Sequence, residues 1–545
     1  MSTHPSTRVL AISTLSPVHI GCGDVYEPSG FVIHDGLLHA FDAADLADAL
    51  SEKEHRQLAR LAEQAEPIGA IQRFFRESAA GLAQLARHQV DIVPALAREY
   101  ADKIGQPTHR DPNGEATYNN FQLARTAYRP LDNAPYLPGS SLKGSIRTAW
   151  LNQKSLDSDI DWQDRSGKNS AATIEQRLLG YRAGEFQNDP FRLLALADAN
   201  PEDADNPPPG RVLYAISKRK RLPRPGDKDP NSELKIFLET IPEALPTAFV
   251  GEMRFGPGAR ISWRALCDAC NAYYRPRLEQ ELRHPVLGHL LDKNWSALIA
   301  DLLGNELGEL LAARQGFLLR VGRHAGAESV TLDGLRRIKI LGPRVGGKQT
   351  FEFRPTTSQN RYASPTRHGD GSLLPFGWLW IDACDDRHRH LADAVRQKLA
   401  RRSRPLLEDH RDRLARREEK LAQHAARLAQ RAAEKEASAA AERAAAQAEE
   451  QRQRELAAMT PNHRRIAQFA ADFAARADQL RGNKENPNAT FHGLARALAR
   501  DAAAWPLDER LAAADAIEHW LPRVVRIDLK DERKKLKLAA LRTPT

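Results

Sequence analysis

Two basic side chains lie beside a glycine-flanked helix start, a combination that could bind phosphate. Residues 136–151 read YLPGSSLKGSIRTAWL, in which Lys143 and Arg147 are spaced i, i+4 and share one face of the expected helix. Ser140 and Ser141 are favoured N-cap residues after the Pro-Gly break. Unpaired N–H groups in the first turn of a helix bind anions. The alternative is a capped surface helix whose charges only aid solubility.

Glycine-rich turns elsewhere offer similar chemistry. The segment SPVHIGCGD, residues 16–24, follows an expected buried strand at 8–15. A later turn lies between two expected strands within 315–332, and another lies within 338–355. Glycine lets the backbone turn tightly or approach a ligand closely. The residues of these turns that we expect to contact phosphate are Gly21, Gly23, Gly322, Arg323, His324, Gly326 and Lys348.

A basic hairpin is predicted in the middle of the chain. Residues 211–224 read as a strand that runs into a basic cluster, and strands resume at 234–241 and 247–255. Cations outnumber acids at the tip, which favours contact with phosphate, although a charge run can also be a solvated loop. The cluster consists of Lys218, Arg219, Lys220, Arg221 and Arg224.

Few residues are suited to catalysis or to metal binding. His19, Asp24 and His324 are the polar groups near glycine turns that could act as acid and base, and a metal-independent ribonuclease needs little more. The alternative for His19 is a hydrogen-bonded loop residue. Cys267 and Cys270 form a CxxC pair, but structural zinc usually takes a second close pair of ligands, which the sequence lacks. We therefore expect no metal and no cofactor.

The composition indicates a soluble protein with about two to four domains. The chain has 545 residues, with 80 Lys and Arg against 71 Asp and Glu, and its net charge of +9 permits an anionic partner without requiring one. Only 4 cysteines argue against a disulfide-stapled secreted protein. The sequence shows neither a signal peptide nor a membrane-spanning apolar stretch, so we expect a cytoplasmic protein without membrane contact.

The chain divides into a mixed α+β part and a helical part. We expect domains at 1–260, which includes a helical insertion and the basic hairpin, and at 261–384. The composition of 385–459 predicts a long charged helix or coiled coil, and a small helical domain at 460–545 follows the helix-starting pair Thr460-Pro461. The leucines that recur every seven residues in the long helix are Leu407, Leu414, Leu421 and Leu428.

Several of these motifs together resemble one protein family. SPVHIGCGD after the first strand, YLPGSSLKGSIRTA at a helix start and LLRVGRHAG before the last strands make residues 8–384 similar to the RAMP superfamily of CRISPR proteins. The order of the parts most resembles the fifth subunit of the type III-A (Csm) effector complex, and terminal subunits of related type III complexes share these parts. After residue 385 the sequence departs from the family.

The resemblance implies a fold and a function. The fold would be α+β, with tandem ferredoxin-like (RRM-like) modules and helical insertions. The protein would be a non-catalytic subunit that binds CRISPR RNA (crRNA) through its backbone, caps the effector filament at the crRNA 3′ end and supports crRNA maturation and antiviral RNA targeting.

The expected partners follow from the same resemblance. They are crRNA and other type III effector subunits, in particular the neighbouring backbone RAMP subunit. An accessory protein could bind the helical arm at 385–545. The alternative function is that of a RAMP endoribonuclease, which would process precursor crRNA or cleave target RNA.

Overall fold

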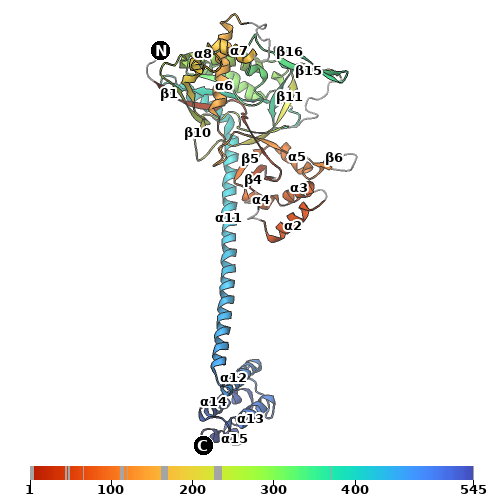
Figure 1. Cartoon of the computed structure of the whole chain (residues 1–545), viewed down its shortest axis with the longest axis vertical. Coiled ribbons are helices and arrows are strands. Elements are labelled where there is room, and N and C mark those ends of the chain that lie inside the picture. The colour runs from red at the N-terminus through yellow and green to blue at the C-terminus, as the bar shows by residue number, and fades with distance from the viewer. Residues whose placement is uncertain are drawn as a thin grey trace. The chain divides into compact units, whose positions relative to one another are not determined.

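In this computed structural model the chain forms two compact units, residues 1–422 and 423–545. The structure describes residues 5–543 except 43–45, 47–49, 65–66, 111–115, 119–120, 161–169, 226–235 and 370. All described strands belong to the first unit (Figure 1), and each unit has its own hydrophobic core. Among the described helices, none combines the length and apolarity that a bilayer crossing requires. The expected α+β class is confirmed.

The first sheet is antiparallel and joins strands from distant parts of the chain. Its order is β10-β13-β1-β19-β14, with β9 also on β13. Since β1 and β13 come from the predicted domain 1–260, and β14 and β19 come from 261–384, these two predicted domains share one sheet. The strand bounds are β1 Ser6–Thr14, β9 Leu194–Leu196, β10 Asn200–Pro201, β13 Phe249–Phe255, β14 Gly316–Arg320 and β19 Trp378–Asp382.

The second sheet is mixed and contains the predicted hairpin. Its order is β2-β8-β12-β11-β5-β4-β3, with β17 on β11 and β18 on β17. β11 pairs antiparallel with β12 and β17, so the hairpin strands are confirmed, while the tip at 226–235 lies outside the described residues. The bounds are β2 Gly21–Tyr26, β3 Phe31–His34, β4 Leu37–Ala40, β5 His88–Ile92, β8 Leu123–Thr126, β11 Arg211–Arg219, β12 Phe237–Thr240, β17 Gln359–Ser364 and β18 Leu374–Pro375.

Two separate ribbons complete the strands of the first unit. They are β6 Pro107–Arg110 with β7 Ala116–Tyr118, and β15 Ile338–Val345 with β16 Lys348–Arg354. The second strand predicted within 315–332 is wrong, because a 3-10 turn at Ala327–Ser329 forms there. Tyr273 of α8 fixes this turn, since its single hydroxyl proton is shared between the carbonyls of Glu328 (3.0 Å) and Thr331 (2.6 Å).

Helices cover the sheets of the first unit. α6 and α8 pack on each other, and the Tyr274 hydroxyl of α8 donates to the Ser145 carbonyl of α6 at 3.0 Å. Leu142, Ile146 and Ala149 form the buried face of α6, close to the predicted face. The helix bounds are α2 Glu52–Ala62, α3 Pro67–Glu77, α4 Ala79–Leu82, α5 Pro94–Lys103, α6 Gly139–Leu156, α7 Ser170–Leu179, α8 Trp263–Leu282, α9 Lys293–Gly304 and α10 Glu306–Ala312.

The predicted long charged helix is present as α11, Arg389–Ala458. Its first turns belong to the first unit, where Val395 and Leu399 are buried in the large core. Leu407 is half-buried against the same core, whereas Leu428 is 52% exposed, so the heptad leucines do not form one continuous seam. The boundary between the two compact units therefore falls within α11, at 422/423, and not at its start.

The second unit is a small helical bundle. The Thr460 hydroxyl caps α12 by accepting from the backbone N–H of His463, and Pro461 occupies the first turn, as the sequence predicts. Phe473 lies at the centre of its core and contacts Phe469 and Phe491. The helix bounds are α12 Pro461–Leu480, α13 Thr490–Ala502, α14 Leu507–Val524, α15 Leu529–Lys535 and α16 Leu538–Leu541.

Two glycines of α6 should respond oppositely to alanine. A Cβ at Gly139 would overlap the carbonyl of Leu196, whereas a Cβ at Gly144 would meet nothing within 4 Å. We expect Gly139→Ala to lower the free energy of unfolding of the first unit by about 1–3 kcal/mol. Gly144→Ala should raise it by about 0.5–1 kcal/mol through helix propensity. Urea denaturation measures both values, and an equal change in both variants would contradict the close approach at Gly139.

Candidate nucleic-acid interface

The chain crosses from the first sheet to the second through residues 15–20. Pro17 accepts a backbone hydrogen bond from Gly377 at 2.8 Å, which ties the crossing to the start of β19 in the first sheet. Val18 and Ile241 exchange backbone hydrogen bonds of 2.9 and 2.8 Å, which tie it to the second sheet. This crossing is therefore held from both sides.

Two of the predicted glycine turns meet at the crossing. The Arg323 N–H donates to the His19 carbonyl at 2.9 Å. Gly322 has a φ of +80° and lies so close to that carbonyl that a Cβ would overlap it. Protein backbone therefore takes the space beside Gly322, which is not open to RNA. Gly23, with a φ of +97°, faces open space, since a Cβ there would meet nothing within 4 Å.

The other predicted glycines have different surroundings. Gly21 begins β2, and a Cβ there would lie 3.4 Å from His19 Nε2. Gly326, with a φ of +83°, leads into the 3-10 turn. Because the register of β2 and β8 shifts between Gly21 and Val25, the predicted glycine loop is a bulged strand.

His19 is a buried, hydrogen-bonded residue of the crossing. Its Nδ1 lies 2.7 Å from the carbonyl of Glu239, and because a carbonyl only accepts, Nδ1 carries the proton. Burial lowers the pKa of His19, so the ring is neutral near pH 7. Its Nε2 is buried without a hydrogen-bond partner among the described residues. The alternative interpretation of His19 as a hydrogen-bonded loop residue is confirmed.

His324 lies in the facing turn and is also neutral. Burial, followed by the charge of Arg361 and the neighbouring His19 and Arg323, lowers the pKa of His324 to about 3. Asp24 is engaged elsewhere, because its Oδ2 accepts a hydrogen bond from the Tyr128 hydroxyl at 2.9 Å. A histidine with this pKa is a poor general acid at neutral pH. The arrangement therefore offers little for acid–base catalysis.

Two arginines next to these histidines form what we call the arginine pair, Arg323 and Arg361. Arg323 is exposed, and Arg361 is half-buried with its Nε donating to the Ser217 hydroxyl at 3.2 Å. Burial and then the like charge of Arg323 lower the pKa of Arg361. Neither has an acidic partner within the part of the chain that the structure describes. The pair can therefore bind an anion such as phosphate.

The basic cluster after β11 is partly neutralised. Lys220 Nζ lies 2.6 Å from Glu328 Oε1. Burial opposes ionisation of that carboxyl, but its hydrogen bond and attraction to Lys220 lower the pKa of Glu328 to about 2. Lys218 donates to the carbonyl of His368 at 2.7 Å, and Arg221 donates to that of Leu222 at 3.0 Å. Lys220 is thus committed to an internal ion pair, and Lys218 and Arg221 each donate to a backbone carbonyl.

The start of α6 is also committed to internal contacts. Asp198 Oδ1 accepts from the Gly139 N–H at 2.7 Å, and Lys143 Nζ donates to the Leu194 carbonyl at 2.6 Å. Arg147 makes two hydrogen bonds to Asp189, of 3.2 and 2.9 Å, and one to Glu175 of 2.7 Å. A carboxylate therefore already occupies the helix start, and Arg147 is neutralised.

The predicted serine caps of α6 are wrong. The helix begins at least two residues earlier than expected, at Gly139, with Pro138 as N-cap and no side-chain cap. Ser140 and Ser141 lie inside the first turn, the former exposed and the latter half-buried. The carboxylate of Asp198 supplies the capping oxygen that we expected from a serine.

The CxxC pair is part of the core. Cys267 and Cys270 are both buried in α8, and burial raises the pKa of Cys267 to about 12. A thiol with this pKa is protonated at neutral pH and is a poor metal ligand. Within the described residues, no group of three or more His, Cys, Asp and Glu side chains is arranged to hold a metal ion.

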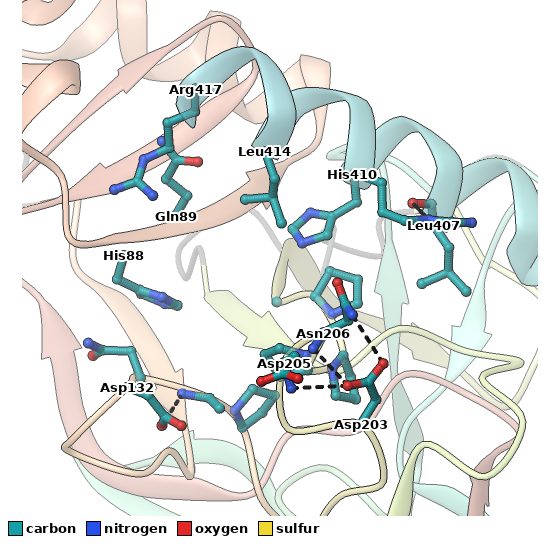
Figure 2. Close-up of a pocket in the computed structure, with 18 of the residues that line it drawn as sticks. His88, Gln89, Asp132, Asp203, Asp205, Asn206, Leu407, His410, Leu414 and Arg417 are labelled. Atoms are coloured by element: carbon teal, nitrogen blue, oxygen red, sulfur yellow. Dashed lines mark hydrogen bonds between the residues drawn. The ribbon is translucent and has the colours of Figure 1, made fainter. Parts of the chain in front are cut away.

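A pocket of about 560 Å³ lies between α11 and the second sheet (Figure 2). His410, Leu414 and Arg417 of α11 line one wall, and Gln89 lies on the sheet side. Its acidic groups bind the protein itself, since Asp203 accepts from the backbone N–H groups of Asp205 (3.0 Å) and Asn206 (3.1 Å). The heptad leucines Leu407 and Leu414 thus line an intramolecular pocket. Sequence reasoning treated them only as a coiled-coil seam.

Sequence reasoning missed two residues that determine which of the predicted groups are open to an anion. Arg361 lies in β17, outside the predicted motifs, and the pairing of β17 with β11 places it opposite Ser217, 144 residues away. Asp198 caps α6 from 59 residues away. Neither residue has a local signal, because each acts through a neighbour that is distant in sequence.

Comparisons with known proteins find similarity to one family in the first half of the chain. Residues 11–255 match the RAMP superfamily. The CRISPR system Cms protein Csm5 of Streptococcus thermophilus is 26% identical over 203 residues, which cover 36% of this chain and 52% of that protein. The chain thus spans about half the length of this relative.

Two solved structures are also similar to the chain. One is the cryo-EM structure of the Csm-crRNA-target RNA ternary complex of a type III-A CRISPR-Cas system, with 17% identity, a TM-score of 0.41 and coverage of 69% of this chain and 100% of that one. The other is the crystal structure of T. onnurineus Csm5, with 16% identity, a TM-score of 0.37 and coverage of 68% and 99%.

His324 should make the stability of the first unit depend on pH. Its folded pKa of about 3 lies below the ordinary value of 6.5, so the unfolded chain binds more protons between these values, and stability falls as the pH falls from 6.5. His324→Asn, which tolerates the φ of +72°, should reduce this loss by about 1–2 kcal/mol between pH 6.5 and 5.

Urea denaturation at the two pH values measures this effect. The matched control is His390→Asn, at an exposed position in the first turn of α11. An unchanged pH dependence in His324→Asn would show that His324 titrates normally in the folded protein.

Proposed function

We propose that this chain, whose residues 11–255 match the RAMP superfamily, is a crRNA-binding subunit of a type III CRISPR effector ribonucleoprotein. The observation that carries the proposal is the arginine pair, Arg323 and Arg361, which lacks an acidic partner among the described residues beside the crossing of residues 15–20. The sequence similarity to a Csm5 protein supports it. The protein is cytoplasmic in this proposal, and its partners are crRNA and other effector subunits.

The chemistry of the interface fits recognition of an RNA backbone. Guanidinium groups bind phosphate oxygens without reading the base, and neutral His19 and His324 add no charge of their own. Gly23, near the start of β2, leaves open space beside the backbone. We therefore place the crRNA backbone along the arginine pair and Gly23, while contacts by Lys218, Arg219, Arg221 and Lys348 stay predictions.

The finer parts of the proposal concern fold and assembly. The antiparallel run β13-β1-β19-β14, covered by α6 and α8, supports a ferredoxin-like (RRM-like) module, and the second sheet would be its partner module. The subunit would cap the effector filament at the crRNA 3′ end and contact the neighbouring backbone subunit. Residues 423–545, which have their own core, would bind an accessory protein.

The arginine pair should control the salt dependence of RNA binding. For single-stranded RNA, each phosphate contact adds about 0.7 to the steepness with which log K falls as log salt concentration rises. Arg323→Ala with Arg361→Ala should therefore make this fall shallower by roughly 1.4. Fluorescence anisotropy with labelled crRNA at several salt concentrations measures the slope.

The matched control changes two other exposed arginines, Arg254 and Arg264. Arg254 pairs with Thr7, at the end of β1 far from the crossing, and should leave the slope unchanged. Equal slopes in the wild type and the Arg323/Arg361 variant would contradict the proposed interface.

The alternative function, an endoribonuclease, has a weaker basis. Its support is that Nε2 of both His19 and His324 is buried and has no hydrogen-bond partner among the described residues. Both pKa values are lowered, however, which removes the general acid, and Asp24 binds Tyr128. We expect no cleavage of repeat RNA or target RNA by the purified chain, with or without Mg²⁺. Cleavage that disappears in His324→Asn would establish the alternative.

A further inference from the structure

The ribbon of β15 and β16 is an exposed element that the proposed interface does not use. Its two strands pair only with each other among the described strands, from Ile338 with Arg354 to Val345 with Lys348. In Figure 1 it lies at the margin of the first unit. Every residue of β16 is exposed, so the ribbon has no core of its own.

One face of the ribbon carries large apolar side chains. Lys339 is opposite Phe353, and Leu341 is opposite Phe351, so these four side chains lie on the same face of the two strands. Leu341 is 64%, Phe351 53% and Phe353 43% exposed. The two rings lie edge to face with centroids 5.7 Å apart. A contiguous apolar surface of this kind is typical of a binding site.

The charge of the ribbon selects the class of partner. Lys339 Nζ lies 4.2 Å from the Phe351 ring centroid, and the Arg337 guanidinium lies 4.4 Å from that of Phe353. The remaining cations are Arg344, Lys348 and Arg354. The ribbon's one acid, Glu352, pairs with Arg354. Exposed aromatic rings flanked by cations match the bases and phosphates of RNA. A protein partner would instead need an apolar patch surrounded by several acidic side chains.

We propose that the face formed by Lys339, Leu341, Phe351 and Phe353 binds single-stranded RNA by stacking unpaired bases on the two phenylalanines. Lys339 and Arg337 contact the flanking phosphates. The proposal rests on the proposed function, because it assumes that the subunit meets RNA. It adds a second kind of contact, since the arginine pair recognises only the backbone, whereas the ribbon requires bases.

The test compares RNA with and without bases. The probes are two labelled 12-mers of equal charge, one of oligouridine and one of abasic ribose-phosphate. The full-length wild type should bind oligouridine more tightly. Phe351→Ala with Phe353→Ala should weaken binding of oligouridine about tenfold or more, and leave binding of the abasic strand unchanged. Because both rings lie outside the core, the melting temperature should stay the same.

A matched control variant is Phe186→Ala, which removes a 59% exposed phenylalanine from another element and should bind both probes as the wild type does. The proposal is overturned if the ribbon variant loses affinity for both probes equally, or for neither. A changed oligomeric state of the ribbon variant with unchanged RNA affinity would instead identify the face as a protein contact. The proposed function is tested separately by the salt dependence of RNA binding in the Arg323→Ala with Arg361→Ala variant. If that variant shows a reduced salt dependence while the ribbon variant binds both probes normally, the proposed function stands and only the ribbon proposal fails.

Discussion

The crossing of residues 15–20 is the constraint on which the first unit depends. A single segment leaves β1 in the first sheet, exchanges hydrogen bonds with Ile241, accepts one from Gly377 and enters β2 in the second sheet. Because its backbone groups are buried, each needs a partner, and the partners come from three distant parts of the chain. Gly322 can approach the His19 carbonyl only because it has no Cβ. The site therefore exists where the two sheets are joined.

Internal ion pairs decide which cations of the first unit remain available to an anionic ligand. Arg147 and Lys220 looked like candidates for phosphate contacts, yet each has a carboxylate within hydrogen-bonding distance. Such partly buried, multiply hydrogen-bonded pairs are costly to break, so their charge is not available to a ligand. Arg323 and Arg361 have no such carboxylate partner among the described residues, and the like charge of Arg323 lowers the pKa of Arg361. The same residue types thus have opposite roles, depending on their neighbours.

The two proposed recognition surfaces have different chemistry. The arginine pair is attached to a well-packed crossing, where the histidines are held neutral by burial. The ribbon has no buried side of its own and exposes aromatic rings on one face. Rigid backbone-directed contacts and an exposed stacking face together would hold an RNA strand without reading its sequence.

Local patterns in the sequence determined the elements, and tertiary contacts determined the site. The spacing of Leu142 and Ile146, the Thr460-Pro461 pair and the helix-rich composition of 385–459 predicted α6, the start of α12 and α11, because propensity and capping act within a few residues. The sequence also predicted the glycine turn that contains Arg323. Sequence could not supply Asp198 at the helix start, the carboxylates around Arg147 or the position of Arg361, since strand pairing and ion pairs join residues tens to hundreds of positions apart. The stretch at 136–151 therefore forms the predicted helix, but its Lys143 and Arg147 are bound by other parts of the chain. By contrast, Arg323 and Arg361 have no acidic partner among the described residues.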